Sequence, residues 1–311
     1  MSVSTVPPMR YLVTGAAGFI GSHLAESLRD LGHDVVGIDC FTDYYDVALK
    51  EENARALDIR RLDLARDPLD FAGFDGIFHL AGQPGVRSFG DVFETYLERN
   101  VLASQRVFEA AARDGVRVVF ASSSSIYGEA EVYPTSEDVA PRPVSPYGIT
   151  KLAAEHLARA TARSFGLDVV VVRYFNAYGP RQRPDMAFAR IAVLLAEGRA
   201  FDLFGDGLQS RSFTYVADIV SGTIAAMESG RGTYNLGGGE EATMRETIAV
   251  FEEFAGRPLQ IREHPAVPGD QRRTKADTTL IRSELGWEPT TALRVGLAAQ
   301  WEWAAARVAA R

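Results

Sequence analysis

Cysteine is almost absent from this sequence. The one residue of that type, Cys40, cannot form an internal disulfide and fits a reducing compartment. No apolar run is long enough to span a bilayer, and the first ten residues, MSVSTVPPMR, lack the apolar core of a signal peptide. These absences predict a cytoplasmic protein with no membrane association.

Positive charge is the second shortage. The chain of 311 residues has 33 lysines and arginines against 41 aspartates and glutamates, a formal charge of -8. This balance argues against a nucleic-acid partner, and no run of like charges indicates a charged tail. The sequence also lacks repeats and low-complexity linkers. With 46% hydrophobic and 24% charged residues, the composition is that of a globular protein, long enough for one large α/β unit or two smaller domains.

What the chain has is an alternation of short apolar segments with helical patterns. The predicted strands are RYLVTG, DVVGID, GIFHLAG, VRVVFASS and LDVVVVRYF, and FIGSHLAESLRDLG after the first strand is a predicted helix. Val-rich strands of this kind are buried on both faces, as in parallel sheets. The sequence therefore predicts an α/β fold with a doubly wound parallel sheet.

Three glycines follow the first predicted strand, in the segment TGAAGFIG. Gly15, Gly18 and Gly21 permit a tight turn and let a pyrophosphate approach the backbone, and the N–H groups of Phe19 and Ile20 open the helix. The spacing is Gly-x-x-Gly-x-x-Gly. An ordinary glycine turn without a ligand is the alternative, but the strand before it and the helix after it are the context that a dinucleotide-binding turn requires.

Asp39 ends the next predicted strand, about 20 residues after these glycines, where a ribose-binding acid is expected. Its carboxylate can accept hydrogen bonds from both hydroxyls of an adenosine ribose and would repel a 2′-phosphate. No arginine occurs in the following CFTDYYD, so NAD is favoured over NADP. At the end of a further predicted strand, before Leu64, Asp63 either meets the adenine edge or is a solvated turn acid.

Tyr147 and Lys151 in SPYGITK are one helical turn apart and therefore share a face. An ammonium beside a phenol favours the phenolate, and an oxidised nicotinamide would add a second positive charge. The pKa of tyrosine, ordinarily about 10, would then approach neutrality, where the phenolate is a general base. In isolation such a pair is usually helix surface; after a dinucleotide motif, and beside the four serines of ASSSSIYG, it indicates a catalytic pair.

Four segments together resemble the extended short-chain dehydrogenase/reductase family, in particular its nucleotide-sugar epimerases and dehydratases. They are TGAAGFIG, SSSSIYG, SPYGITK and RYFNAYGP. The likeness extends over nearly the whole chain. It implies a Rossmann domain in mainly residues 9–180 that holds NAD tightly, and a smaller, loop-rich substrate-binding region in mainly residues 181–311, interleaved with the first. It also implies a Ser–Tyr–Lys triad, which the IYG motif assigns to Ser123, Tyr147 and Lys151.

The same resemblance implies further contacts and no metal. The implied cofactor contacts include the glycine turn, Asp39, Asp63 and Leu64. The others are Leu80, Ala81, Gly82, Asn100, Tyr147 and Lys151, with Tyr174 against the nicotinamide. On the substrate side they are Asn176 near the sugar or diphosphate, Arg211 near a phosphate, and Asp270 and Arg272 toward the uridine and diphosphate.

The residues after the triad serine bear on the reaction. Members of the family begin by removing the O4 proton of the sugar and passing the C4 hydride to NAD. Dehydratases then use an Asp-Glu pair directly after the triad hydroxyl, and the related uronate decarboxylases use a glutamate; here those positions are Ser124 and Ser125. Neither serine can act as an acid or base at neutral pH, so the resemblance implies return of the hydride, which is epimerisation at C4.

The sugar is predicted from the same serines. Ser124 and Ser125 can bind a C6 carboxylate without repelling it, and Arg87 and Arg183 can add positive charge; alternatively the serines are only a polar strand end. The segments DYYDVALKEENARAL and RPDMA resemble UDP-glucuronate 4-epimerases, which predicts conversion of UDP-glucuronate to UDP-galacturonate through a 4-keto intermediate. Asn176 is common in neutral-sugar enzymes and keeps a UDP-glucose 4-epimerase as the alternative. A catalytically silent NAD-binding regulator is the non-enzyme alternative.

The expected partners are a UDP-sugar and a second copy of the chain. Apolar residues at helical spacing occur in VFETYLERNVLASQRVFEAAA and SPYGITKLAAEHLARATA. They predict either a homodimer with a four-helix contact or ordinary packing on the sheet.

Overall fold

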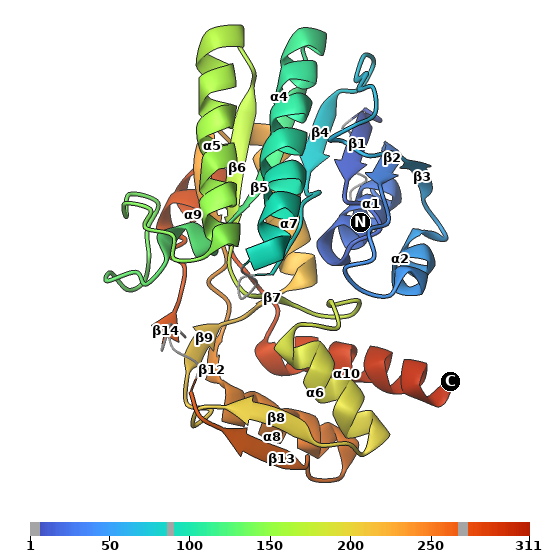
Figure 1. The fold of residues 1–311 in the computed structure, drawn as a ribbon, viewed down its shortest axis with the longest axis vertical. Coiled ribbons are helices and arrows are strands. Elements are labelled where there is room, and N and C mark those ends of the chain that lie inside the picture. Colours follow the sequence, from blue (N-terminus) through green and yellow to red (C-terminus); the bar gives the residue numbers. More distant parts are fainter. Residues whose placement is uncertain (1–6, 86–89, 267–272) are drawn as a thin grey trace. The chain divides into compact units, whose positions relative to one another are not determined.

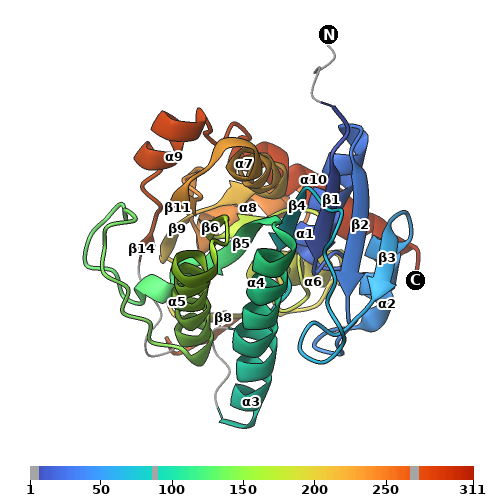
Figure 2. The same ribbon diagram turned by 90° about the horizontal axis from the view of Figure 1, so that it is seen from above.

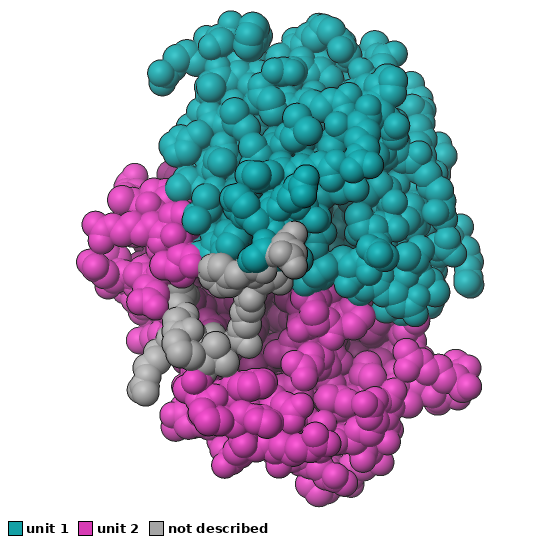
Figure 3. Space-filling model, viewed as in Figure 1, with its two compact units in different colours: residues 1–125, 145–171, 226–232 teal, residues 126–144, 172–225, 233–311 magenta. Residues whose placement is uncertain are grey.

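The structure, a computed structural model, describes residues 7–85, 90–266 and 273–311. The chain divides into two compact units, which Figure 3 colours separately. Unit 1 takes its residues from 1–125, 145–171 and 226–232, and unit 2 takes its residues from 126–144, 172–225 and 233–311. Each unit is thus built from several chain segments, while the binding roles predicted for residues 9–180 and 181–311 stay predictions. None of the described helices has both the length and the apolar composition needed to cross a bilayer.

The largest sheet has seven strands (Figure 1): β1 (Arg10–Thr14), β2 (Asp34–Asp39), β3 (Asp58–Arg61), β4 (Gly76–His79), β5 (Arg117–Ser123), β6 (Val169–Tyr174) and β11 (Gly232–Leu236). Their order in the sheet is β11-β6-β5-β4-β1-β2-β3. β1 pairs in parallel with β2 and β4, β2 pairs with β3, and β4 pairs with β5 in the same sense. The predicted α/β class is confirmed. The strand order reverses between β1 and β4, and open α/β sheets bind ligands outside the carboxyl ends of the strands at such a point.

The helices of unit 1 are α1 (Phe19–Asp30), α2 (Val47–Ala54), α3 (Phe93–Tyr96), α4 (Ala103–Asp114) and α5 (Pro146–Phe165). The 3-10 turn η1 (Gly90–Val92) and the π-helical turn η2 (Leu97–Leu102) also belong to this unit, and the 3-10 turn η3 (Ser124–Tyr127) begins in it and ends in unit 2. α5 is well delimited: the Ser145 side chain accepts a hydrogen bond from the Gly148 N–H, Pro146 occupies the first turn, and Gly166 ends the helix at a φ of 71°. α4 and α5 lie side by side in both views (Figures 1 and 2).

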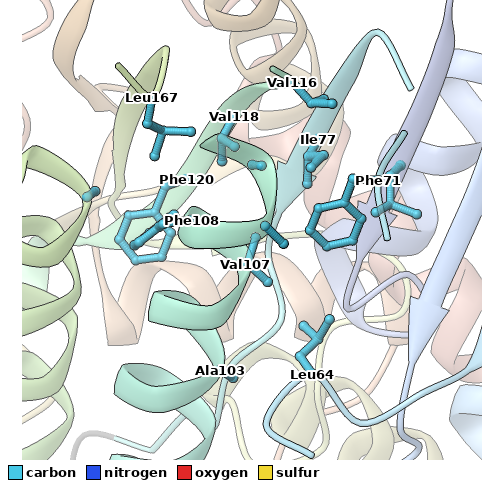
Figure 4. Packing of buried hydrophobic residues seen from close by; sticks show 14 of the residues in the cluster. Leu64, Phe71, Ile77, Ala103, Val107, Phe108, Val116, Val118, Phe120 and Leu167 are labelled. Atoms are coloured by element: carbon cyan, nitrogen blue, oxygen red, sulfur yellow. The ribbon is translucent and has the colours of Figure 1, made fainter. Parts of the chain in front are cut away.

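The core of unit 1 lies between the sheet and these helices (Figure 4). Phe108 on α4 meets Phe120 on β5 edge to face, with ring centroids 5.3 Å apart. Val107 and Ile77 continue this cluster, and all four side chains are fully buried. The apolar strand positions recognised in the sequence therefore form the sheet face on which α4 and α5 pack.

Unit 2 combines helices with small strands of 2 to 4 residues. Its helices are α6 (Ala187–Glu197), most of α7 (Val216–Ser229), α8 (Met244–Ala255), α9 (Thr279–Leu285) and α10 (Leu293–Ala309), and its small strands are β7 (Ala177–Tyr178), β8 (Phe201–Phe204), β9 (Ser210–Ser212), β10 (Thr214–Tyr215), β12 (Glu241–Thr243), β13 (Ile261–His264) and β14 (Arg273–Thr274). They form the sheets β10-β7, β12-β9-β14 and β13-β8. Within the region predicted to be loop-rich, the segment FGDGLQSRSFTYV also contains the short strands β9 and β10. Strands of two or three residues are too short for a periodicity argument to detect.

The core of unit 1 makes a stability prediction. Phe108→Ala should lower the free energy of unfolding by about 3–5 kcal/mol, because the buried ring leaves a cavity next to Phe120. The matched control is Phe165→Ala at the end of α5, where the ring is 70% exposed and the loss should stay within about 0.5 kcal/mol. Urea unfolding followed by circular dichroism measures both. Equal losses for the two variants would contradict this account of the core.

Candidate active site

The glycine turn between β1 and α1 brings three backbone segments together. Gly15 has a φ of 71°, and a Cβ there would lie 2.9 Å from the Ala81 nitrogen. A Cβ on Gly21 would lie 2.1 Å from the Gly15 carbonyl oxygen, so α1 can approach the turn only without a side chain. Gly18 is the N-cap residue of α1, and no side chain caps the helix there. The turn therefore leaves backbone N–H groups available to a pyrophosphate and fits a dinucleotide.

Asp39 lies at the end of β2, where two backbone groups orient its carboxylate. Oδ2 accepts a hydrogen bond from the Ala17 N–H at 3.1 Å, and Oδ1 accepts one from the Phe41 N–H at 2.7 Å. The first of these contacts ties the acid to the glycine turn. A carboxylate has about four lone-pair positions, so both oxygens keep acceptor capacity for ribose hydroxyls.

Asp63 follows β3 and has structural partners. Its Oδ1 accepts a hydrogen bond from the Ala65 N–H at 2.9 Å, and its Oδ2 pairs with Arg99 Nη1 at 2.8 Å. Leu64 is buried in the core of unit 1. These contacts match the alternative of a turn acid, and a contact of either residue with adenine stays a prediction.

The end of β4 lies against the glycine turn. The Leu80 and Ala81 N–H groups donate to the Thr14 carbonyl and hydroxyl oxygens, at 3.3 and 3.1 Å. The Thr14 hydroxyl also lies 2.8 Å from Nδ1 of the fully buried His79, whose Nε2 lies 3.0 Å from Ser104 Oγ. Burial lowers the pKa of His79 to about 3, so its ring is neutral. This histidine, which the sequence analysis passed over, holds the strand end in place through two hydroxyls.

Asn100 is placed by the π-helical turn η2 and is fully buried. Its Oδ1 accepts a hydrogen bond from the Gln83 N–H at 2.7 Å, and its Nδ2 donates to the Gln83 carbonyl and to Thr150 Oγ1, each at 3.1 Å. A Cβ on Gly82 would lie 2.8 Å from Asn100 Oδ1. Asn100 thus joins the segment after β4 to α5, next to the two residues of the predicted catalytic pair.

Lys151 is buried on α5, with 4% of its surface exposed. Its Nζ lies 4.7 Å from the centroid of the Phe120 ring and would lie 3.7 Å from a Cβ on Gly82. Burial lowers its pKa to about 8, although the negative charge of Glu155 opposes the change. One turn earlier, the half-buried Tyr147 has its ring centroid 6.4 Å from that of Tyr96. A phenol and an ammonium with an accessible pKa can exchange a proton with a bound hydroxyl.

The serine row changes conformation within four residues. Ser122 and Ser123 end β5, while Ser124 and Ser125 begin the 3-10 turn η3. Ser123 Oγ accepts a hydrogen bond from the Ser125 N–H at 3.2 Å and donates to Ser125 Oγ at 3.1 Å. Ser123 and Ser125 are therefore coupled, although the sequence predicts separate roles for them.

Four of the predicted residues that the structure describes lie in unit 2, and each has partners within the protein: Tyr174, Asn176, Arg183 and Arg211. Tyr174 exchanges a hydrogen bond with Thr223 Oγ1 at 2.9 Å, and burial raises its pKa. Asn176 Nδ2 donates to the Ser212 carbonyl at 3.2 Å and to Thr274 Oγ1 at 3.1 Å. Arg211 Nη1 donates to the same Thr274 hydroxyl at 3.5 Å. Their contacts with a ligand stay predictions.

Arg183 does not present an uncompensated charge. Its Nε and Nη2 each donate to one oxygen of Asp185 at 3.0 Å. The positive charge predicted for a sugar carboxylate is thus shared with a neighbouring acid. The remaining substrate-side predictions, Arg87, Asp270 and Arg272, lie outside the described residues. Among the residues that are described, no group of three or more His, Cys, Asp or Glu side chains is arranged to hold a metal ion.

Comparison with known proteins agrees with this geometry. The family described as NAD dependent epimerase/dehydratase matches residues 11–237. Bacillus subtilis YtcB, named an uncharacterized UDP-glucose epimerase, is 41% identical over 93% of this chain and 96% of its own. A UDP-glucuronate 4-epimerase of Thermodesulfobacterium geofontis is 35% identical over 94% and 95% of the two chains. The crystal structure of Bacillus cereus UDP-glucuronic acid 4-epimerase with UDP-glucuronic acid and NAD has a TM-score of 0.91, at 38% identity over 95% and 99%.

The position of Asp39 makes a prediction about cofactor retention. The protein should release NAD on denaturation, and Asp39→Ala should retain at least about tenfold less, because charge-assisted hydrogen bonds to the ribose are lost. Asp30→Ala, an exposed acid at the end of α1, is the control. Chromatography of the released nucleotide measures all three proteins. Release of NADP, or wild-type NAD content in Asp39→Ala, would refute the role given to Asp39.

Proposed function

The chain belongs to the NAD dependent epimerase/dehydratase family, and from this premise we propose that it converts UDP-glucuronate into UDP-galacturonate by epimerisation at C4. The observation that carries the substrate is the pair Ser124 and Ser125 in the turn η3, directly after the triad position Ser123. The similarity to enzymes named UDP-glucuronate 4-epimerase supports the same choice.

The residues of unit 1 suffice for the proton transfers. Tyr147, as phenolate, takes the proton from the sugar O4, and the Lys151 ammonium beside it stabilises the phenolate. Ser123 orients O4 through its hydroxyl. The glycine turn and Asp39 would hold the dinucleotide, and bound NAD supplies an acceptor that can return the hydride to either face of C4. Return of the same proton from Tyr147 completes the cycle.

A uronic acid poses a particular difficulty for such an enzyme. Oxidised at C4, it is a β-keto acid, which loses CO2 readily when the carboxylate bond aligns with the carbonyl π system. Hydroxyls from Ser124 and Ser125 that hold the carboxylate out of this alignment would protect it. Neither can protonate the enolate that decarboxylation leaves. The absence of an acid at these two positions is therefore part of the proposed specificity.

A neutral sugar such as UDP-glucose is the second candidate substrate. Asn176 favours it, since asparagine is common at this position in neutral-sugar epimerases, and the pairing of Arg183 with Asp185 reduces the positive charge available to a carboxylate. The similarity to a protein named UDP-glucose epimerase supports it too. A catalytically silent NAD-binding regulator would turn over neither sugar.

A panel of UDP-sugars tests the substrate. The wild-type enzyme should epimerise UDP-glucuronate faster than UDP-glucose, with little UDP-pentose formed, as followed by NMR of the products. Ser124→Ala and Ser125→Ala should each weaken discrimination for the uronate by about tenfold, the loss of one hydrogen bond to a charged group, and release more CO2. Because Ser125 is coupled to Ser123, Ser125→Ala should also slow epimerisation of UDP-glucose, whereas Ser124→Ala should not.

Two results would count against this assignment. Equal or faster turnover of UDP-glucose by the wild-type enzyme would favour the neutral sugar. No turnover of any sugar by protein that retains NAD would favour the silent regulator.

We also propose that the enzyme is a homodimer. The helical stretch from η1 to η2 exposes Phe93, Leu97 and Leu102, and α5 exposes Ile149, with 42–50% of each side chain accessible. Both stretches belong to unit 1, and α5 packs against both α3 and η2. Exposed apolar residues gathered on adjacent helices are typical of interfaces between copies.

This assembly is tested by adding charge to the exposed side chains. Leu97→Lys should shift the protein from dimer to monomer in sedimentation equilibrium. Val295→Lys on α10, where the side chain is 63% exposed, is the matched control and should leave the mass unchanged. A wild-type monomer, or a Leu97→Lys dimer of wild-type stability, would exclude this surface.

A further inference from the structure

Ser122, the first serine of the row, has no role in the reaction described above. It precedes Ser123 on β5, and successive side chains of a strand point to opposite faces. Its hydroxyl donates a hydrogen bond of 2.6 Å to Oε1 of Glu155 on α5. Both side chains are buried, Ser122 to 2% exposure and Glu155 to 0%. A polar bond between a strand and a helix in the interior of unit 1 requires an explanation.

Glu155 is the more unusual partner. It lies one helical turn after Lys151 and receives a second hydrogen bond, of 2.9 Å, from Arg159 Nη2. Moving a carboxylate out of water is costly, and apolar residues of similar volume in such places often stabilise a fold more than an ion pair does. The general stability of α5 therefore does not account for an acid at this position. Its neighbours along the helix, Tyr147 and Lys151, do.

We propose that Ser122 and Glu155 are positioning residues of the active site, an inference that rests on the proposed function of the triad. Their hydrogen bond fixes the end of β5, which carries Ser123, against α5 at a point one turn after Lys151 and two turns after Tyr147. The Glu155 carboxylate also keeps the buried Lys151 side chain in its ammonium form. Neither residue touches the reacting atoms.

The groups around Lys151 support an electrostatic role for Glu155. Burial lowers the pKa of Lys151 to about 8, and the charge of Glu155 raises it. From β5, the Phe120 ring faces the ammonium, and from β4 the neutral His79 stacks on that ring with centroids 5.6 Å apart.

The other elements near α5 contribute groups that are engaged elsewhere. η2 contributes Asn100, whose amide binds Gln83 and Thr150. α4 contributes Ser104, which is bonded to His79. α3 contributes Tyr96, which faces Tyr147, and α5 itself adds Arg159, already paired with Glu155. Of the groups named here around Lys151, Glu155 is the one that carries a negative charge.

The sign of the expected effect follows from that charge. Removing a negative charge near Lys151 lowers the pKa of its ammonium further below 10.5, its ordinary value, so the ammonium is lost at a lower pH. The alkaline limb of the kcat profile should then move to lower pH. Tyr147, deprived of its cation, should ionise at a higher pH. A residue that only stabilises the fold would change stability, or kcat and KM together, without moving either titration.

Glu155→Gln tests the electrostatic role, because it removes the charge and keeps the size. We expect about tenfold lower kcat at pH 8, unchanged KM, and an alkaline limb of the kcat profile at lower pH. The tyrosinate absorbance of NAD-loaded enzyme should appear at higher pH. The absorbance of Tyr147→Phe gives the contribution of the other tyrosines. Glu155→Asp, which keeps the charge, should restore both titrations. Glu109→Gln makes the same change on the exposed face of α4 and should behave as wild type.

Ser122→Ala tests the positioning role and decides the matter if Glu155→Gln does not fold. It should lower kcat several-fold at unchanged KM, because only the alignment of Ser123 with α5 is lost, and it should not move the alkaline limb, because the carboxylate remains. Wild-type kcat in Ser122→Ala would overturn the inference, and so would wild-type titrations in folded Glu155→Gln. If Tyr147→Phe loses turnover in the same experiments, the triad itself stands. Wild-type turnover in Tyr147→Phe would overturn the triad and the inference with it.

Discussion

The absence of a Cβ atom at Gly15 and Gly21 lets the β1–α1 turn, the start of α1 and the end of β4 approach one another closely. A side chain at Gly21 would overlap the Gly15 carbonyl, and one at Gly15 would press on the Ala81 backbone. Because these contacts are made by the backbone alone, the segment after β4 lies beside the turn. In this position the Gln83 N–H can donate a hydrogen bond to Asn100 Oδ1. The dinucleotide turn and the helix that carries Tyr147 and Lys151 are linked through this chain of contacts.

Buried polar groups in unit 1 are costly, and they are concentrated near the reaction. Asn100, His79, Lys151, Ser122 and Glu155 are all buried close to the carboxyl ends of β1, β4 and β5. Asn100, His79, Ser122 and Glu155 have hydrogen-bond partners in the protein. Among the described residues, Lys151 is instead surrounded by an aromatic face and an acid one turn away. As an ammonium, Lys151 lies one helical turn from Tyr147, where its charge can stabilise a phenolate.

Much of unit 1 could be predicted because its signals are local. The strands β1, β2 and β5 were predicted within a residue or two, and the fold class, the family resemblance and NAD as cofactor are confirmed. The sequence could not decide between the two roles of Asp63, because its partner Arg99 comes from a segment distant in sequence. Ser122 and Glu155 were missed for the same reason, although Glu155 stands at helical spacing from Lys151. In unit 2 the short strands gave no periodic signal, and the pairing of Arg183 with Asp185 depends on side-chain geometry.

The π-helical turn between α3 and α4 makes this part of the chain sensitive to length. An α-helix advances about 100° per residue, and a π turn accommodates one more residue than an α turn does. Asn100 points inward from this turn to Gln83 and Thr150, while Leu97 and Leu102 are exposed. Loss of a single residue here would regularise the helix and rotate everything before it by about a quarter of a turn relative to α4. In related sequences the number of residues in this turn should therefore vary less than the residues themselves.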